Sequence, residues 1–163
     1  MSGWFARVGR PLSSDEQEVI GELIDSAAPQ ASREVTLLTS WRDALQFVRA
    51  SAYDSDWWDQ EEREREWLWT RVAELQSEST LLQGMAALHV GLDAQVRAAA
   101  MAAGANDPSV LSEAIGSALL AAQQNALAVF AGELPDHRFR RKFALFEAGR
   151  WPLGYHAARF VIF

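Results

Sequence analysis

The densest group of chemically active side chains lies between residues 54 and 66, where seven carboxylates stand against two arginines. The segment therefore carries a local charge of −5, within a chain whose net charge is −7. Carboxylates at this density could exchange protons in general acid and base catalysis, hold a metal ion, or form a solvated helix face. A solvated helix face is the commonest outcome for such a charge run.

Tryptophans flank this acidic segment and favour a role for it in binding. Trp67, Leu68 and Trp69 are consecutive and span about 200° around a helix, so they cannot all face the interior. We therefore expect at least one indole at the surface beside carboxylates. Aromatic anchors surrounded by acids are typical of an interface that selects a basic protein partner. The expected partner-binding residues are Trp57, Asp59, Glu61, Glu62, Glu64 and Trp67.

A metal site is the alternative chemistry. His89 and Asp93 stand four residues apart and would offer two ligands from one helix edge, completed by His137, His156 or a glutamate of the acidic segment. Arg97 continues the same spacing, and a row of this kind is more typical of a surface salt-bridge ladder. The chain contains no HExxH, GxSxG, Walker or GxGxxG motif. We therefore expect no cofactor and assign no catalytic residue.

Six basic residues near the carboxyl end could bind phosphate or nucleic acid. The acidic balance of the whole chain argues against a nucleic-acid binder, because phosphate contacts need a net positive face. We expect these residues to pair with the acidic segment instead. They are Arg138, Arg140, Arg141, Lys142, Arg150 and Arg159.

The segments that carry these side chains need a central helix to hold them in place, and the sequence predicts such a helix over residues 108–130. The nineteen positions between Glu113 and Glu133 are uncharged and rich in alanine, as expected for a central helix enclosed by others. Asp107 supplies an N-cap, Pro108 suits the first turn, and Gly132 closes the far end. A membrane span is disfavoured by a polar edge, expected to face solvent, at Ser109, Ser112, Glu113, Gly116, Ser117, Gln123 and Gln124.

Five further helices are indicated by caps and by apolar residues at spacings of three and four. The clearest stripe is Leu81, Met85, Leu88, Leu92, Val96, Ala99 and Ala103. The expected helices run from Ser13 or Ser14 to Pro29, from Ser40 to a break at 53–56, over 57–76, from Ser77 or Ser79 to Gly104, and from Asp136 to Gly149.

Two segments have strand composition, residues 34–39 and the apolar carboxyl end at 158–163, and we expect them to pair in a small sheet. Residues 4–8 are expected to form a short strand or an anchoring arm. The predicted fold is mainly α: a single domain over 1–163, a bundle of about six helices with a small two- or three-stranded sheet. A chain of 163 residues is long enough to bury its own core.

Composition narrows the functional classes. Cysteine is absent, which excludes disulfides, thiolate metal sites and a cysteine nucleophile. The amino terminus shows no apolar signal region, so we expect a cytoplasmic protein.

The sequence thus favours an acidic, cytoplasmic protein-binding module. Its most specific form is an immunity or antitoxin protein that inhibits a basic toxin or nuclease stoichiometrically. We expect neither a nucleic-acid nor a membrane partner. Two alternatives stay open: a metal- or carboxylate-dependent enzyme near His89 and Asp93, and an oligomeric structural subunit whose apolar carboxyl end extends a neighbour's sheet.

Overall fold

Most helices begin where a side chain satisfies free backbone N–H groups, as the sequence predicted. Ser13 forms a capping box with Glu16, and Ser77 and Asp107 each accept from backbone N–H groups of the turn that follows. Ser40 accepts from the backbone N–H three residues on. His137 caps the last helix through its ring, a role that the sequence did not suggest.

The computed structural model describes residues 3–28, 30–50 and 55–163. Its helices and strands confirm the expected mainly α fold with a small sheet. The expected helix end at Pro29 and the first part of the expected break at 53–56 lie outside the described residues, whereas Ser55 already belongs to a helix. The elements are α1 (Ser14–Ala27), β1 (Val35–Leu37), α2 (Trp41–Ala50), α3 (Ser55–Leu75), α4 (Glu78–Ala102), α5 (Pro108–Phe130), α6 (Arg138–Glu147), β2 (Pro152–His156) and β3 (Arg159–Ile162).

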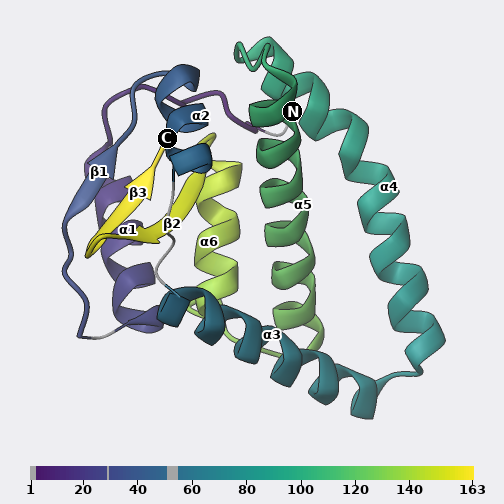
Figure 1. Ribbon diagram of the computed structural model, residues 1–163. Coiled ribbons are helices and arrows are strands. Elements are labelled where there is room, and N and C mark those ends of the chain that lie inside the picture. The colour runs from purple at the N-terminus through teal and green to yellow at the C-terminus, as the bar shows by residue number, and fades with distance from the viewer. Residues whose placement is uncertain (1–2, 29, 51–54) are drawn as a thin grey trace.

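The alanine-rich helix α5 runs through the middle of the molecule, between α4 and α6, with α3 crossing below them in the view of Figure 1. Small residues such as Ala114, Ala118 and Ala121 are fully buried and let neighbouring helices approach closely. The expected solvent-facing edge of α5 is wrong at Gln124, which is buried. Its side-chain amide is paired with charged groups of α3 and α6, which a helical wheel cannot show.

The sheet has the order β1-β3-β2, so the carboxyl-terminal strand is its middle strand. β3 runs parallel to β1, with Val35 opposite Phe160, which confirms the expected pairing of 34–39 with 158–163. Because β3 is paired on both sides, it offers no free edge for a neighbour's strand. The structure therefore gives no support to the alternative in which the apolar carboxyl end extends the sheet of a neighbouring subunit.

The third strand, β2, was not predicted, since the sequence around Trp151 and Pro152 resembles a turn. β2 and β3 form an antiparallel hairpin whose connection places Ala157 and Ala158 at positive φ. Such hairpin turns usually contain asparagine and glycine, which make them recognisable in a sequence. Two alanines are not typical of this turn, so the sequence does not predict the hairpin.

The amino-terminal segment forms turns rather than a strand, and it acts as the expected anchoring arm. Trp4 and Phe5 are buried in the main core cluster against Phe146 of α6. Helix α4 turns its apolar stripe to α5 and leaves Leu82 and Val90 exposed. None of the described helices combines the length and apolar character needed to cross a membrane.

Candidate functional site

The acidic helix α3 is fixed to the core by its inner face. Leu68 and Val72 are completely buried, and Trp57 is only 5% exposed. The Trp57 ring stacks on Tyr155 of β2, with 5.4 Å between ring centroids. Trp57, expected at a binding surface, therefore lies in the interior and cannot reach a partner in this structure.

Glu61 is the second expected surface residue that the structure places inside, at 3% exposure. Its Oε1 accepts hydrogen bonds from Lys142 Nζ at 2.5 Å and from Gln124 Nε2 at 2.8 Å. Lys142 also donates to Gln124 Oε1 at 3.3 Å, and Arg138 Nη2 lies 3.8 Å from Glu61 Oε2. The expected place of Glu61 at a binding surface is thus wrong, because two cations from α6 neutralise its carboxylate inside the protein.

The electrostatics of this buried cluster follow from its contacts. Burial opposes the charge on Glu61, but Lys142, Gln124 and Arg138 together outweigh it, so the pKa of Glu61 is lowered. Burial also lowers the pKa of Arg138, against the attraction of Glu61 and Glu64. The cluster holds two cations and one buried carboxylate, an arrangement that ties α3, α5 and α6 together.

The other four members of the basic patch also pair internally, but with groups outside the acidic segment, so the expected pairing with that segment is confirmed only for Arg138 and Lys142. Arg141 contacts Glu22 at 3.1 Å, and Arg140 donates to the backbone carbonyl of Glu133 at 3.0 Å. The remaining pairs are Arg150 with Glu16 and Arg159 with Glu34.

The outward face of α3, which we define as Asp59, Glu62, Glu66 and Trp67, carries the other expected binding residues. All four are exposed, and Trp67 shows 51% of its surface. The guanidinium of Arg71 lies 5.2 Å from the Trp67 ring centroid.

Two neighbouring acids on α3 are engaged with partners. A hydrogen bond from Arg65 lowers the pKa of Glu62. Glu64, expected to bind a partner, is half-buried, and its Oε1 lies 3.0 Å from Nε2 of His137.

The two residues of the alternative metal site lie on α4, away from the acidic helix. His89 is exposed, and Asp93 pairs with Arg97 at 3.7 Å, which is the surface ladder that the sequence suggested. Within the described ranges, no three histidine, aspartate or glutamate side chains are placed to hold a metal ion together. This alternative therefore gains no support from the geometry.

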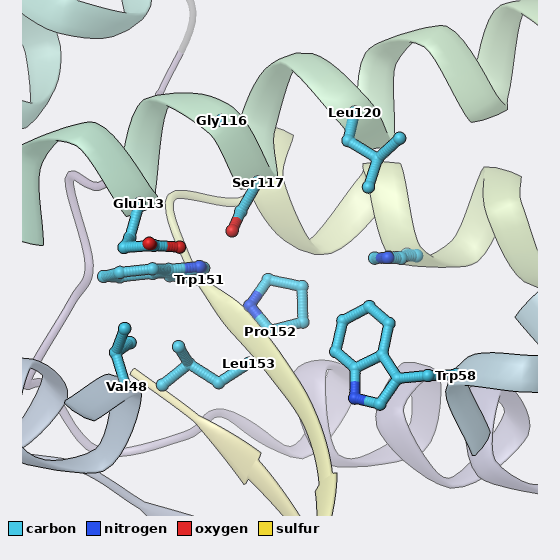
Figure 2. Close-up of a pocket in the computed structure, with 10 residues that line it drawn as sticks. Val48, Trp58, Glu113, Gly116, Ser117, Leu120, Trp151, Pro152 and Leu153 are labelled. Atoms are coloured by element: carbon cyan, nitrogen blue, oxygen red, sulfur yellow. The ribbon is translucent and has the colours of Figure 1, made fainter. Parts of the chain in front are cut away.

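A pocket of about 550 Å³ opens between α2, α3, α5, α6 and β2 (Figure 2). Sequence reasoning missed it, because its walls come from five elements and form no motif. Part of the signal was present, since three members of the polar edge of α5 face it. The lining residues are Val48, Trp58, Glu113, Gly116, Ser117, Leu120, Lys142, Trp151, Pro152 and Leu153.

Local backbone geometry sets one wall of the pocket. Gly154 of β2 has φ +103, and a Cβ atom there would lie 3.1 Å from Cζ2 of Trp58. The missing side chain lets the indole of Trp58 lie directly against the strand. Trp58 also lies beside Lys142, whose Nζ is 5.5 Å from the Trp58 ring centroid.

Comparison of the chain with protein-family models, with curated proteins and with solved structures gives no significant match.

Proposed function

We propose that the chain is a protein-binding module that recognises a basic partner through the outward face of α3. The observation that carries the proposal is the half-exposed indole of Trp67, on a helix that also exposes the carboxylates of Asp59, Glu62 and Glu66. Exposed tryptophans are among the commonest energetic anchors of protein interfaces. Carboxylates exposed on the same helix as such an anchor favour a basic partner and repel an acidic one.

The anchoring of α3 from beneath supports this proposal. Glu61, Leu68 and Val72 fix the helix to the core, and the Arg71 guanidinium restrains the Trp67 ring. A surface that is already ordered loses less conformational entropy when a partner binds. The outward face therefore has the rigidity that tight stoichiometric binding requires.

The charge distribution around α3 adds to this argument. The neighbouring helix α1 exposes further acids, among them Asp15 and Glu18, and the net charge of the chain is −7. A field of this sign accelerates association with a positively charged protein. The most specific form of the proposal is an immunity or antitoxin protein acting in the cytoplasm, which blocks a basic toxin or nuclease and needs no catalytic group of its own.

A capture experiment with matched variants tests the proposal. The purified chain is immobilised, partners are recovered from its native cells, and the affinity of the recovered partner is measured after purification. We expect Trp67→Ala to weaken that affinity more than tenfold. We expect Glu62→Lys with Glu66→Lys to weaken it further, because the partner is basic.

The matched control reverses two exposed acids on another helix, Asp15→Lys with Glu18→Lys, which changes the net charge by the same amount. The α1 variant should retain most of the binding. Equal losses of affinity in both charge variants would show that the attraction depends on net charge and not on the outward face of α3. Unchanged affinity in the Trp67→Ala and α3 charge variants would reject the outward face of α3 as the binding surface. A partner that is a toxin or nuclease should lose activity at a one-to-one ratio.

A further inference from the structure

Two ionisable side chains line the pocket between α2, α3, α5, α6 and β2, and they differ in whether a partner inside the protein balances their charge. The ammonium of Lys142 is compensated inside the protein by Glu61 and Gln124. The carboxylate of Glu113, at the exposed edge of the pocket, makes no hydrogen bond or ion pair within the described part of the chain. Of the two, Glu113 is therefore the one whose charge has no partner in the described part of the chain.

The walls of the pocket are mainly apolar and aromatic. Trp58 and Trp151 contribute indoles, and Val48, Leu120 and Leu153 add aliphatic surface. Figure 2 shows Glu113 and Ser117 of α5 directed toward the same space as the indole of Trp151. Indole faces attract cations, and their flat surfaces suit a planar apolar body.

We propose that this pocket binds a small organic cation with a flat apolar body. The ammonium or guanidinium of the ligand pairs with the carboxylate of Glu113, and its apolar body lies among the indoles and aliphatic side chains. A volume of about 550 Å³ is within the range of pockets that hold small molecules. The hydroxyl of Ser117 is a further polar contact available to the ligand.

This inference is independent of the protein-binding proposal. Trp58 and Trp67 are nine residues apart on α3, which places them about 180° apart around the helix. The indole of Trp67 and the pocket therefore lie on opposite sides of α3, and each proposal can fail without the other.

Three probes with the same indole body and different charge test the charge preference: tryptamine, tryptophol and indoleacetate. Affinity is measured by calorimetry at low salt. We expect tryptamine to bind about fivefold more tightly than neutral tryptophol, the contribution typical of one solvent-accessible ion pair, and indoleacetate to bind most weakly. Glu113→Gln should bring tryptamine and tryptophol to equal affinity, and it should fold because Glu113 has no internal partner to lose.

The location of binding is tested by filling the pocket. A Cβ added at Gly116 meets nothing within 4 Å, so Gly116→Leu projects a side chain into the cavity from α5. We expect it to abolish tryptamine binding. Gly84→Leu on α4 is the matched control, since Gly84 is also helical, exposed and free of neighbours within 4 Å, and it should leave binding unchanged.

The proposal is overturned if none of the probes binds, if all three bind equally, or if tryptamine still binds the folded Gly116→Leu variant. Should Gly116→Leu not fold, Glu113→Gln decides the question alone. Retention of the full tryptamine preference in that variant would remove Glu113 from the site and overturn the proposal.

Discussion

The guanidinium of Arg150 and the carboxylate of Glu16 form a two-pronged ion pair across 134 residues of sequence, with N–O distances of 2.8 and 3.0 Å. Arg150 has no exposed surface at all. It also donates hydrogen bonds to the backbone carbonyls of Arg7, Arg10 and Pro11. One side chain therefore joins the amino-terminal arm, the start of α1 and the end of α6.

Replacing Arg150 should be among the most destabilising single changes in the chain. Arg150→Met would remove the main charged partner of the buried Glu16 carboxylate, which keeps the Ser13 N–H and a 3.4 Å contact with Arg7. It would also remove the Arg150 donors from three backbone carbonyls, and removing one partner of a buried pair typically costs about 3–5 kcal/mol. We expect a loss of that size in the free energy of unfolding, measured by urea denaturation. Arg159→Met, which breaks an exposed pair with Glu34, should cost less than about 1 kcal/mol. Similar losses in both variants would contradict the structural role assigned to Arg150.

The same pair makes stability depend on acid pH. Burial opposes the charge on Glu16, but hydrogen bonds from Arg150 and from the backbone of Ser13 outweigh it, so its pKa falls from 4.5 to about 2. A depressed pKa means that the folded state holds the proton less tightly than the unfolded state does. The stabilisation is therefore complete above about pH 5 and is lost as the pH falls toward 2.

The expected loss from this group is about 3 kcal/mol of unfolding free energy, since one pKa unit corresponds to about 1.4 kcal/mol. Other paired carboxylates also titrate in this range, so the measurement compares the wild type with Glu16→Gln. The difference in stability between the two should shrink by about 3 kcal/mol between pH 7 and pH 2. A difference that stays constant with pH would show that Glu16 titrates normally.

Local signals in the sequence predicted the elements well. Ser13, Ser77 and Asp107 mark helix starts by their own chemistry, and the uncharged run from 114 to 132 identifies the central helix. The pairing of β1 with β3 followed from composition, because few other segments resembled strands. The hairpin of β2 could not be predicted, since its turn lacks the usual residues.

The candidate site was predictable only in part. Helical geometry required one exposed tryptophan in α3, and the structure exposes Trp67. Which acids would be buried depends on partners far along the chain: Glu61 is buried because Lys142, 81 residues away, neutralises it. The pocket depends on the packing of five elements, so no single stretch of sequence could indicate it.

The ion pair of Glu61 and Lys142 should show strong coupling. Each single change, Glu61→Met or Lys142→Met, leaves a buried charge without its main partner and is expected to cost about 3–5 kcal/mol. The double variant removes both charges and should cost clearly less than the sum of the two. We expect a coupling energy of about 2 kcal/mol or more from urea denaturation of the four proteins.

Arg138 remains in the cluster when Glu61 and Lys142 are both replaced, so the double variant still contains one buried cation. Glu62→Met with Arg65→Met provides the exposed comparison on the same helix and should couple by less than about 1 kcal/mol. Additive effects of Glu61→Met and Lys142→Met would mean that their contact does not stabilise the fold.

Substituting Gly154 should move Trp58 and thereby disturb the pocket. Gly154 has φ +103, and a Cβ atom would lie 3.1 Å from Cζ2 of Trp58, so Gly154→Ala combines backbone strain with a steric conflict. Gly132→Ala isolates the strain alone, since Gly132 has φ +78 and no atom within 4 Å of an added Cβ. We expect Gly132→Ala to cost about 1–2 kcal/mol and Gly154→Ala to cost at least 1 kcal/mol more, both measured by urea denaturation. Equal costs would mean that Trp58 moves aside freely, and the close contact between Trp58 and β2 would then not define the pocket wall.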